Sequence, residues 1–211
     1  LSQKKNFKYE KLFFNKITDY CIKENKNFIY LSSSLVYKNK EKNYETSKKL
    51  DHHKNEYINS KIIFDKIIIN KIEKGLKVLM LRIPSIYGTK LENIKLINLN
   101  KKNLLLNKTI NFYRSKNNYI RFVHVGDICK VIKKSIKLNI TGVYNLESGE
   151  NIKIFNIIKF LQKNLKSKSK IKITNKNINS ISFPNLEIMK IKKIFNIIPK
   201  KKFISLLRKI K

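Results

Sequence analysis

The first half of the chain alternates between helical and strand-like hydrophobic patterns. Residues 10–24 place apolar side chains at helical spacing, and residues 56–74 repeat this pattern in a longer segment that Gly75 ends. A short apolar run follows each of these helices, at residues 28–33 and 78–84, and each run has the length of a buried strand. This order of helices and strands predicts an α/β fold with a parallel sheet and helices on its faces.

The second half of the chain has a less regular pattern. Residues 122–125 predict another short strand, and Asp127 is well placed to cap the helix that follows it. Pro199 separates two C-terminal segments that have helical spacing. The other expected elements are a loop at 38–55, a short helix and a strand within 90–119, a strand at 143–146, a helix at 152–165, a strand at 170–174, and short helices at 185–196 and 202–210.

Size and composition indicate a globular protein of the cytoplasm. With 211 residues, of which 42% are hydrophobic, the chain can bury the core of one domain with a small appendage. No segment approaches the roughly 20 apolar residues that span a bilayer, and the N-terminal segment does not have the pattern of a signal peptide. The distant Cys21 and Cys129 predict no disulfide framework, and His52 and His53 lack partners at metal-ligand spacing. We therefore expect a cytoplasmic protein without a metal.

The formal net charge of +34 has two explanations. Clustered cations favour nucleic acids, because binding releases counterions from the phosphate backbone. However, the chain has 44 lysines but only 4 arginines, it has no alanine, and its lysines are spread along its whole length. Nucleic-acid binders normally also use arginine, which reads phosphates and guanine. We therefore interpret the charge as a compositional bias that favours acidic ligands in general, and we predict no specific nucleic-acid binding.

Three consecutive serines interrupt the apolar segment FIYLSSSLVY, which spans residues 28–37. An ordinary polar turn after a strand would explain Ser32, Ser33 and Ser34. In an open parallel sheet, however, binding and catalytic groups gather at the carboxyl ends of the strands. The serines lie at such an end, which makes their hydroxyls candidates for a functional site.

A tyrosine and a lysine follow at helical spacing. Tyr57 comes 24 residues after Ser33, and Lys61 lies four residues further, on the same face of the expected helix. A nearby ammonium favours the phenolate, so we expect Lys61 to lower the pKa of Tyr57 and to make it an acid or base near neutral pH. The same spacing occurs at Tyr44 and Lys48 in the polar loop, so the pair alone is not specific in this lysine-rich chain.

Taken together, five segments resemble the extended short-chain dehydrogenase/reductases. In chain order they are FIYLSSSLVY, EYINSK, VLMLRIPSIYG, YIRFVHVGDI and GVYNLESGENI. The NAD-dependent nucleotide-sugar epimerases and dehydratases of that family carry a strand ending in SSxxVYG, a YxxxK helix, a strand ending in RPxNVYG, and later segments like RDFVHVDD and GVYNLGSGE. The order and spacing agree over residues 25–155. Five motifs in register are far more specific than any one of them.

The resemblance implies a role for each matching residue. Ser33, four residues before the tyrosine of the first motif, matches the catalytic Ser/Thr, with Ser34 as the neighbouring alternative. Both serines are also expected to contact the substrate. Tyr57 matches the catalytic acid/base, and Lys61 matches the lysine that binds the nicotinamide ribose. Pro84 falls where the backbone at the strand end touches the nicotinamide.

Several positions depart from the family pattern. No glycine-rich phosphate loop precedes residue 28, which implies an N-terminally truncated fragment of the fold. Ser85 replaces the substrate-contacting Asn of RPxNVYG, and Lys38 replaces a glycine. An ungapped alignment puts Ile120 at the phosphate-contacting arginine and displaces Arg121 by one residue, onto the opposite face of a strand. We still expect Ser85 and Arg121 to bind the substrate.

The resemblance also implies an architecture. We expect an α/β chain that forms the C-terminal part of a doubly wound, Rossmann-type parallel-sheet fold with a small mixed substrate-binding subdomain. Residues 1–89 would form the remaining part of the NAD-binding domain, and residues 90–211 would form mainly the substrate-binding subdomain, with a strand and a helix near 122–146 returning to the first domain. His124 and Asp127 match the HVDD segment, where we expect a histidine at the core edge and a helix cap.

The implied function is that of an NAD-dependent nucleotide-sugar epimerase, like UDP-glucose 4-epimerase, acting by hydride transfer through a keto-sugar intermediate. Dehydratases of the family carry acidic residues after the Ser/Thr, where this chain has Ser34 and Leu35. The alternatives are a nucleotide-sugar dehydratase, a keto-sugar reductase of the same family, or a non-catalytic truncated relative. NAD is the expected cofactor, with NADP as the alternative. The expected partners are a nucleotide sugar and a second copy of the chain, bound through the helix of Tyr57 and its neighbour.

Overall fold

The computed structural model describes residues 3–38, 41–91, 94–113, 119–174, 183–200 and 202–210. The chain divides into two compact units. Unit 1 comprises Leu1–Pro84, Ile128–Leu146 and Pro184–Ile198, and unit 2 comprises Ser85–Asp127, Glu147–Phe183 and Pro199–Lys211. We expected a division into 1–89 and 90–211 with a return near 122–146. In the structure the first change of unit falls after Pro84, and the sequence pattern gave no sign of the second return at Pro184–Ile198.

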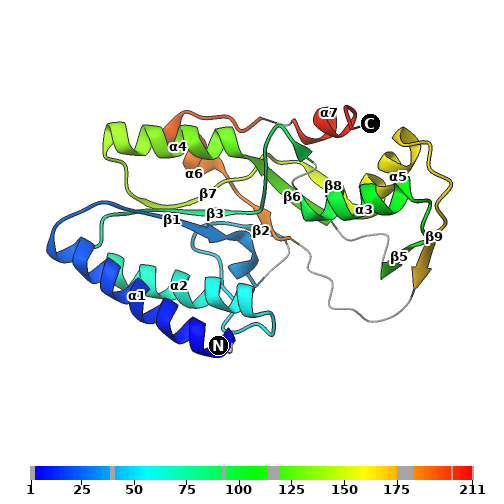
Figure 1. The fold of residues 1–211 in the computed structure, drawn as a ribbon. Helices are drawn as coiled ribbons and strands as arrows, with labels where there is room; N and C mark the ends of the chain where they lie inside the picture. Colours follow the sequence, from blue (N-terminus) through cyan, green and yellow to red (C-terminus); the bar gives the residue numbers. More distant parts are fainter. Residues whose placement is uncertain are drawn as a thin grey trace. The chain divides into compact units, whose positions relative to one another are not determined.

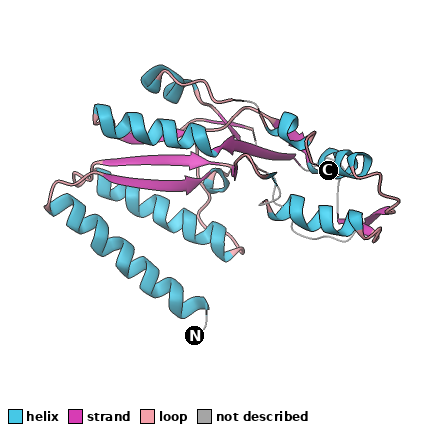
Figure 2. Cartoon of the chain, turned by 45° about the horizontal axis from the view of Figure 1, so that its top comes forward, coloured by secondary structure: helices cyan, strands magenta, loops and turns pink. Residues whose placement is uncertain are grey.

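Unit 1 is built on a parallel sheet with the strand order β1-β3-β7. The strands are β1 (Phe28–Ser33), β3 (Val78–Ile83) and β7 (Gly142–Asn145). Helices α1 (Gln3–Lys23) and α2 (Glu56–Ile72) cover one face, while α4 (Val125–Leu138) and α6 (Met189–Phe195) cover the other (Figure 1). Every residue of β3 is buried, as expected of a central strand with helices on both faces (Figure 2).

Short elements and aromatic contacts complete unit 1. A single turn of 3-10 helix, η1 (Ser34–Val36), follows β1, and β2 (Lys42–Asn43) pairs with β10 (Asn185–Leu186). Phe14 of α1 stacks on Phe64 of α2 with ring centroids 4.5 Å apart, and it meets Tyr30 of β1 edge-on at 5.2 Å. These rings explain the apolar spacing of the two helical segments, because they join both helices to the sheet.

Unit 2 is a smaller mixed assembly. Its main sheet has the order β4-β6-β8, with a parallel and an antiparallel pair, and β5 pairs with β9 in a second sheet. The strands are β4 (Ser85–Tyr87), β5 (Ile110–Tyr113), β6 (Tyr119–His124), β8 (Asn151–Lys153) and β9 (Ile171–Thr174), and the helices are α3 (Lys95–Leu105), α5 (Ile154–Asn164) and α7 (Phe203–Leu207).

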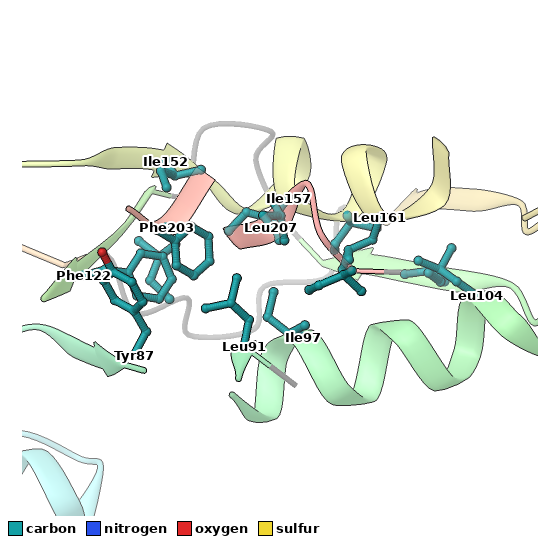
Figure 3. Packing of buried hydrophobic residues seen from close by; sticks show 14 residues of the cluster. Tyr87, Leu91, Ile97, Leu104, Phe122, Ile152, Ile157, Leu161, Phe203 and Leu207 are labelled. Atoms are coloured by element: carbon teal, nitrogen blue, oxygen red, sulfur yellow. The ribbon is translucent and has the colours of Figure 1, made fainter. Parts of the chain in front are cut away.

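The C-terminal segment supplies part of the core of unit 2. Phe203 stacks on Phe122 with ring centroids 3.9 Å apart, and Tyr87 meets Phe203 edge-on at 5.5 Å (Figure 3). The backbone N–H of Lys202 donates to the Tyr87 hydroxyl at 3.1 Å, and the N–H of Phe203 donates to a Glu150 carboxylate oxygen at 3.3 Å. The segment after Pro199 therefore packs as part of the unit.

The expected elements occur, with local differences. Helix α4 begins at Val125, so Asp127 lies in its first turn and does not cap it from outside. Its carboxylate instead accepts a hydrogen bond from the backbone N–H of Lys200 at 2.8 Å. The segment 185–196 begins with the short strand β10, because Asn185 and Leu186 pair with β2 before α6 starts.

A buried ion pair joins the elements of unit 1. The Arg82 guanidinium on β3 is fully buried, and it donates to the Asp65 carboxylate of α2 through Nε at 2.9 Å and through Nη2 at 2.6 Å. The Ser32 hydroxyl of β1 donates to the same carboxylate at 2.8 Å. Arg82 also donates to the Tyr37 hydroxyl at 3.0 Å, and Tyr37 donates to Asn145 at 2.7 Å. The network thus connects all three strands with α2 and the segment after β1.

We predict that Asp65→Asn lowers the free energy of unfolding of the whole chain by about 3–5 kcal/mol, because it leaves the Arg82 charge buried without its counter-ion. Denaturant titration measures the change. The matched control is Asp51→Asn, which removes the exposed ion pair between Asp51 and Lys66 and should change stability by less than about 1 kcal/mol. Equal effects of the two substitutions would contradict the central role of Arg82.

Candidate active site

Each of the three serines at the end of β1 has a different environment. Ser32 is bonded to Asp65, as described above. The Ser33 Oγ accepts a hydrogen bond from the backbone N–H of Leu35 at 3.1 Å and so caps η1. The Ser34 hydroxyl is fully buried and has no hydrogen-bond partner among the described residues. Ser33 therefore combines a fixed orientation with a hydroxyl proton that is still available for donation.

Tyr57 and Lys61 lie at the N-terminal end of α2. The Asn55 side chain caps this helix by accepting from the backbone N–H of Ile58 at 3.1 Å. The Tyr57 side chain is largely exposed, with 59% of its surface accessible, whereas Lys61 reaches back to β1. The Lys61 Nζ lies 5.8 Å from the centroid of the Tyr57 ring, so the one-turn spacing does bring the two side chains together.

Lys61 binds the strand edge that carries Ser33. Its Nζ donates to the Leu31 carbonyl oxygen at 2.9 Å and lies 5.1 Å from the Tyr30 ring centroid. The Phe28 N–H donates to the carbonyl oxygen of Lys77, so the backbone polar groups of Phe28 face β3. In a strand these groups alternate in direction from one residue to the next, so those of Leu31 face the opposite edge of β1. Within the described residues β1 pairs only with β3, so Lys61 lies at an edge without a neighbouring strand.

The electrostatics of this pair differ from the sequence expectation. Partial burial raises the pKa of Tyr57 and lowers the pKa of Lys61, because desolvation disfavours the charged form of each group. We expected Lys61 to lower the pKa of Tyr57. In the chain alone, desolvation of the phenol is the cause of the raised pKa of Tyr57, and sequence spacing carries no signal for the degree of burial.

The segment after β3 contains Pro84 and Ser85, which fall in different units. Pro84 is buried directly after the last residue of β3, and it closes unit 1. Ser85 opens β4 in unit 2 and lines a cavity of about 640 Å³ there. The other lining residues are Ile86, Tyr87, Gly88, Thr89, Lys90, Ile94, Lys95, His124 and Val125. The size is that of a small-molecule site.

The polar groups of this cavity are mostly cationic or hydroxylic. Lys90 and Lys95 supply positive charge, and Ser85 and Thr89 supply hydroxyls. His124 accepts a hydrogen bond from the Gly126 N–H at Nδ1, at 3.1 Å, which leaves Nε2 as the protonated nitrogen of the neutral ring. Such a lining suits an anionic ligand. Among so many lysines, the sequence pattern gave no reason to single out these two.

Arg121 is held within unit 2. Its side chain on β6 is buried and donates to a Glu147 carboxylate oxygen at 3.0 Å. Ile120 is buried as well, with 7% of its surface exposed. The family pattern has an acidic residue at position 121 and a glycine at position 147, so the ion pair occupies two positions at which this chain departs from that pattern. If Arg121 contacts the substrate as expected, its guanidinium has to bind the substrate and Glu147 at the same time.

Comparisons with known proteins identify the family and the fold of the chain. The profile of the NAD dependent epimerase/dehydratase family matches residues 8–154, so the chain belongs to this family. Similar solved structures include a dTDP-glucose 4,6-dehydratase from Bacillus anthracis in complex with NAD, which has a TM-score of 0.77 and 22% sequence identity. The alignment covers 93% of this chain and 64% of that one. The comparison confirms the α/β, Rossmann-type fold.

Two epimerases are similar at a comparable level. The UDP-glucose 4-epimerase from Thermotoga maritima with UDP-glucose has a TM-score of 0.73 and 16% identity, over 90% of this chain and 64% of that one. The UDP-glucuronic acid 4-epimerase from Bacillus cereus with NAD has a TM-score of 0.75 and 17% identity, over 93% and 64%. The chain therefore spans less than two thirds of these structures. No curated protein matches the sequence.

Two candidate classes of site find no support in the described part of the chain. No group of three or more His, Cys, Asp or Glu side chains there can hold a metal ion. No helix there is both long enough and apolar enough to cross a membrane.

The contrast between Ser33 and Ser34 gives a second prediction. Ser33→Ala removes the cap of η1 and should cost about 1 kcal/mol of stability. Ser34→Ala removes a buried hydroxyl that has no partner in the described structure, so stability should stay within about 0.5 kcal/mol or increase. Denaturant titration of the two variants beside the parent chain measures both. A larger loss from Ser34→Ala would show that Ser34 makes the structural contact.

Proposed function

We propose that the whole protein is an NAD-dependent nucleotide-sugar 4-epimerase. The observation that carries the proposal is the arrangement in unit 1, where Lys61 contacts the edge of the strand that ends in Ser33 and lies beside the Tyr57 ring. Membership in the NAD dependent epimerase/dehydratase family supports the reaction class. The similar structures include epimerases and dehydratases, so they support the class rather than one reaction.

In this proposal Tyr57, Ser33 and Lys61 each have a separate role in the reaction of one sugar hydroxyl. Tyr57 takes the proton of that hydroxyl, because its phenol is exposed and its ring lies 5.8 Å from the Lys61 ammonium. The Ser33 hydroxyl holds the same oxygen by a hydrogen bond, and its orientation is fixed by the N–H of Leu35. Lys61 stabilises the phenolate. The substrate passes through a keto-sugar before the hydrogen returns to the opposite face.

The residues of unit 1 fit the nicotinamide end of NAD. Lys61 makes one hydrogen bond to a carbonyl and no ion pair in the described structure, so further N–H groups remain for ribose hydroxyls. Pro84 lies at the adjoining end of β3, where its backbone can contact the nicotinamide. When bound, NAD supplies the acceptor and later the donor of hydride. NADP is the alternative, because the groups that distinguish the two cofactors belong to the adenosine end.

The cavity of unit 2 is the proposed site for the diphosphate of the nucleotide sugar. Lys90 and Lys95 give it positive charge, and Ser85 and Thr89 add hydroxyl donors. With this assignment, the diphosphate has cationic partners even though Arg121 is paired with Glu147. In the proposal, Ser85 retains the substrate contact implied by its position, while Arg121 contributes from the side of its guanidinium that faces away from Glu147.

An epimerase is favoured over a dehydratase by the residues after Ser33. Dehydratases of the family tend to carry acidic side chains there. Ser34 is buried and Leu35 is apolar, so neither can act as an acid or base at neutral pH. A keto-sugar reductase of the same family and a non-catalytic relative are the remaining alternatives, and a turnover assay separates them.

We further propose that the protein works in the cytoplasm as a homodimer. Helix α1 exposes Tyr9, Leu12, Phe13 and Tyr20, each with more than half of its surface accessible. Their spacing puts them on one side of the helix, as in a packing stripe. Association through this stripe would place α1 and α2 of two copies together, and sedimentation of the chain before and after Phe13→Ser would measure it.

For the mechanism, we predict that Tyr57→Phe in the whole protein abolishes epimerisation of a UDP-sugar, with a loss of at least about 100-fold, while NAD binding is kept. Product formation measured by chromatography and NAD binding measured by calorimetry test the two parts. Tyr44→Phe is the matched control, because Tyr44 has the same spacing to a lysine but lies in the exposed loop, and full activity is expected. Full turnover of the Tyr57→Phe protein would overturn the proposal.

For the cavity of unit 2, we predict that Lys95→Gln raises KM for the nucleotide sugar by about tenfold and leaves kcat nearly unchanged. The reason is that a phosphate contact is made equally in the ground state and the transition state. Lys108→Gln, an exposed lysine of the same unit, controls for the loss of one charge from a chain of net charge +34. Identical KM values for the two variants would remove the diphosphate from this cavity.

A further inference from the structure

A second cavity of unit 1 lies on another face of α2. Its volume is about 420 Å³, and it is formed by α2 and the loop that precedes it. Ile62, Lys66 and Ile69 recur along α2 at intervals of one turn, so they share a face that differs from the face of Tyr57. The full lining is Val36, Lys48, Lys49, Leu50, Asp51, Ile62, Asp65, Lys66, Ile69 and Asn70.

Some charged side chains of this cavity form ion pairs, and Lys49 does not in the described structure. Asp65 is bonded to Arg82, and Lys66 lies 3.4 Å from an Asp51 carboxylate oxygen. Lys49, by contrast, forms no ion pair in the described part of the chain. Its Nζ donates to the carbonyl oxygen of Glu45 at 2.8 Å.

The Lys49 amine can lose its proton without losing this contact. A neutral amine still donates through N–H, so the hydrogen bond to the Glu45 carbonyl exists in both protonation states. Burial and the positive charge of Arg82 lower the pKa of Lys49 to about 8, and Asp65 and Glu45 offset this only in part. The Lys49 Nζ also lies 5.6 Å from the centroid of the Tyr37 ring. Unlike the hydrogen bond to Glu45, this cation–π contact requires the amine to be charged.

We propose that this cavity is a covalent binding site for short aliphatic aldehydes, which the Nζ of Lys49 captures as an imine. The nitrogen lone pair attacks the carbonyl carbon, a proton passes from nitrogen to oxygen, and water leaves as the C=N bond forms. No other reactant is consumed. The partly exposed apolar side chains of Leu50 and Ile69 provide the wall for the aliphatic chain. This site uses none of the groups assigned to epimerisation.

The experiment traps the imine and locates it. The whole chain is incubated at pH 7.5 with butanal and cyanoborohydride, and the alkylation rate of each lysine is measured by mass spectrometry after digestion. Lys49 should react at least about tenfold faster than Lys42 or the exposed Lys108, which both lie outside the cavity, because a pKa of about 8 leaves far more of the Lys49 amine in its neutral form. Lys42 is a strong internal control, since its ion pair with Glu187 raises its pKa.

Two further arms separate a built site from general amine reactivity. Lys49→Arg keeps the charge and should lose the fast site while all other lysines keep their rates. With formaldehyde in place of butanal, the ratio of the Lys49 rate to the Lys108 rate should fall at least threefold, because formaldehyde has no chain to bind the apolar wall. Equal rates at Lys49 and Lys108, or the same ratio for both aldehydes, would overturn the proposal. Tyr57→Phe should change neither rate, so failure of the epimerase proposal would remain distinguishable.

Discussion

The structure of unit 1 depends on a buried charge that must be neutralised. Arg82 lies on the central strand with no exposed surface, and a guanidinium in that position is tolerated only when its donors are bonded to acceptors. Asp65 supplies the counter-charge from α2, and the remaining donors reach Tyr37 and the carbonyl oxygen of Glu45. The ion pair therefore sets the position of α2 relative to the sheet.

The candidate active site uses the helix that this ion pair positions. Lys61 and Tyr57 lie about one and two turns before Asp65 on α2, so a shift of the helix would move all three side chains together. Ser32, next to Ser33, is bonded to the same carboxylate. The orientation of the catalytic candidates thus follows from a contact that takes no part in the chemistry. Burial then tunes the site, because it disfavours charge on both Tyr57 and Lys61.

The excess of lysine has different consequences at different places in the fold. Most lysines are exposed, and solvent screens them. Lys61 and Lys49 are partly buried and lack a carboxylate partner in the described structure, so their pKa values are lowered. Lys42 pairs with Glu187, and this contact raises the pKa of Lys42. One residue type therefore supplies a site lysine, a candidate nucleophile and ordinary surface charge, and only the local environment distinguishes them.

Elements with a local signal in the sequence lie close to their expected bounds in the structure. The periodicity of α2, the apolar run of β3 and the serines after β1 are each patterns within a short segment. Contacts between distant segments have no such signal. The return of Pro184–Ile198 to unit 1, the docking of Phe203 on Phe122 and the pairing of Arg121 with Glu147 join positions that no local pattern connects.

The family, the order of the helices and strands, and the residue types at the candidate site can all be predicted from the sequence. Those properties follow from hydrophobic periodicity and from motifs in register, which are written along the chain. Three other properties depend on the tertiary structure. They are which serine hydroxyls form hydrogen bonds, which lysines are desolvated, and which arginines form ion pairs with a carboxylate. Hydrogen bonding, burial and ion pairing depend on distances between residues that are remote in sequence, and those distances exist only after the chain has packed.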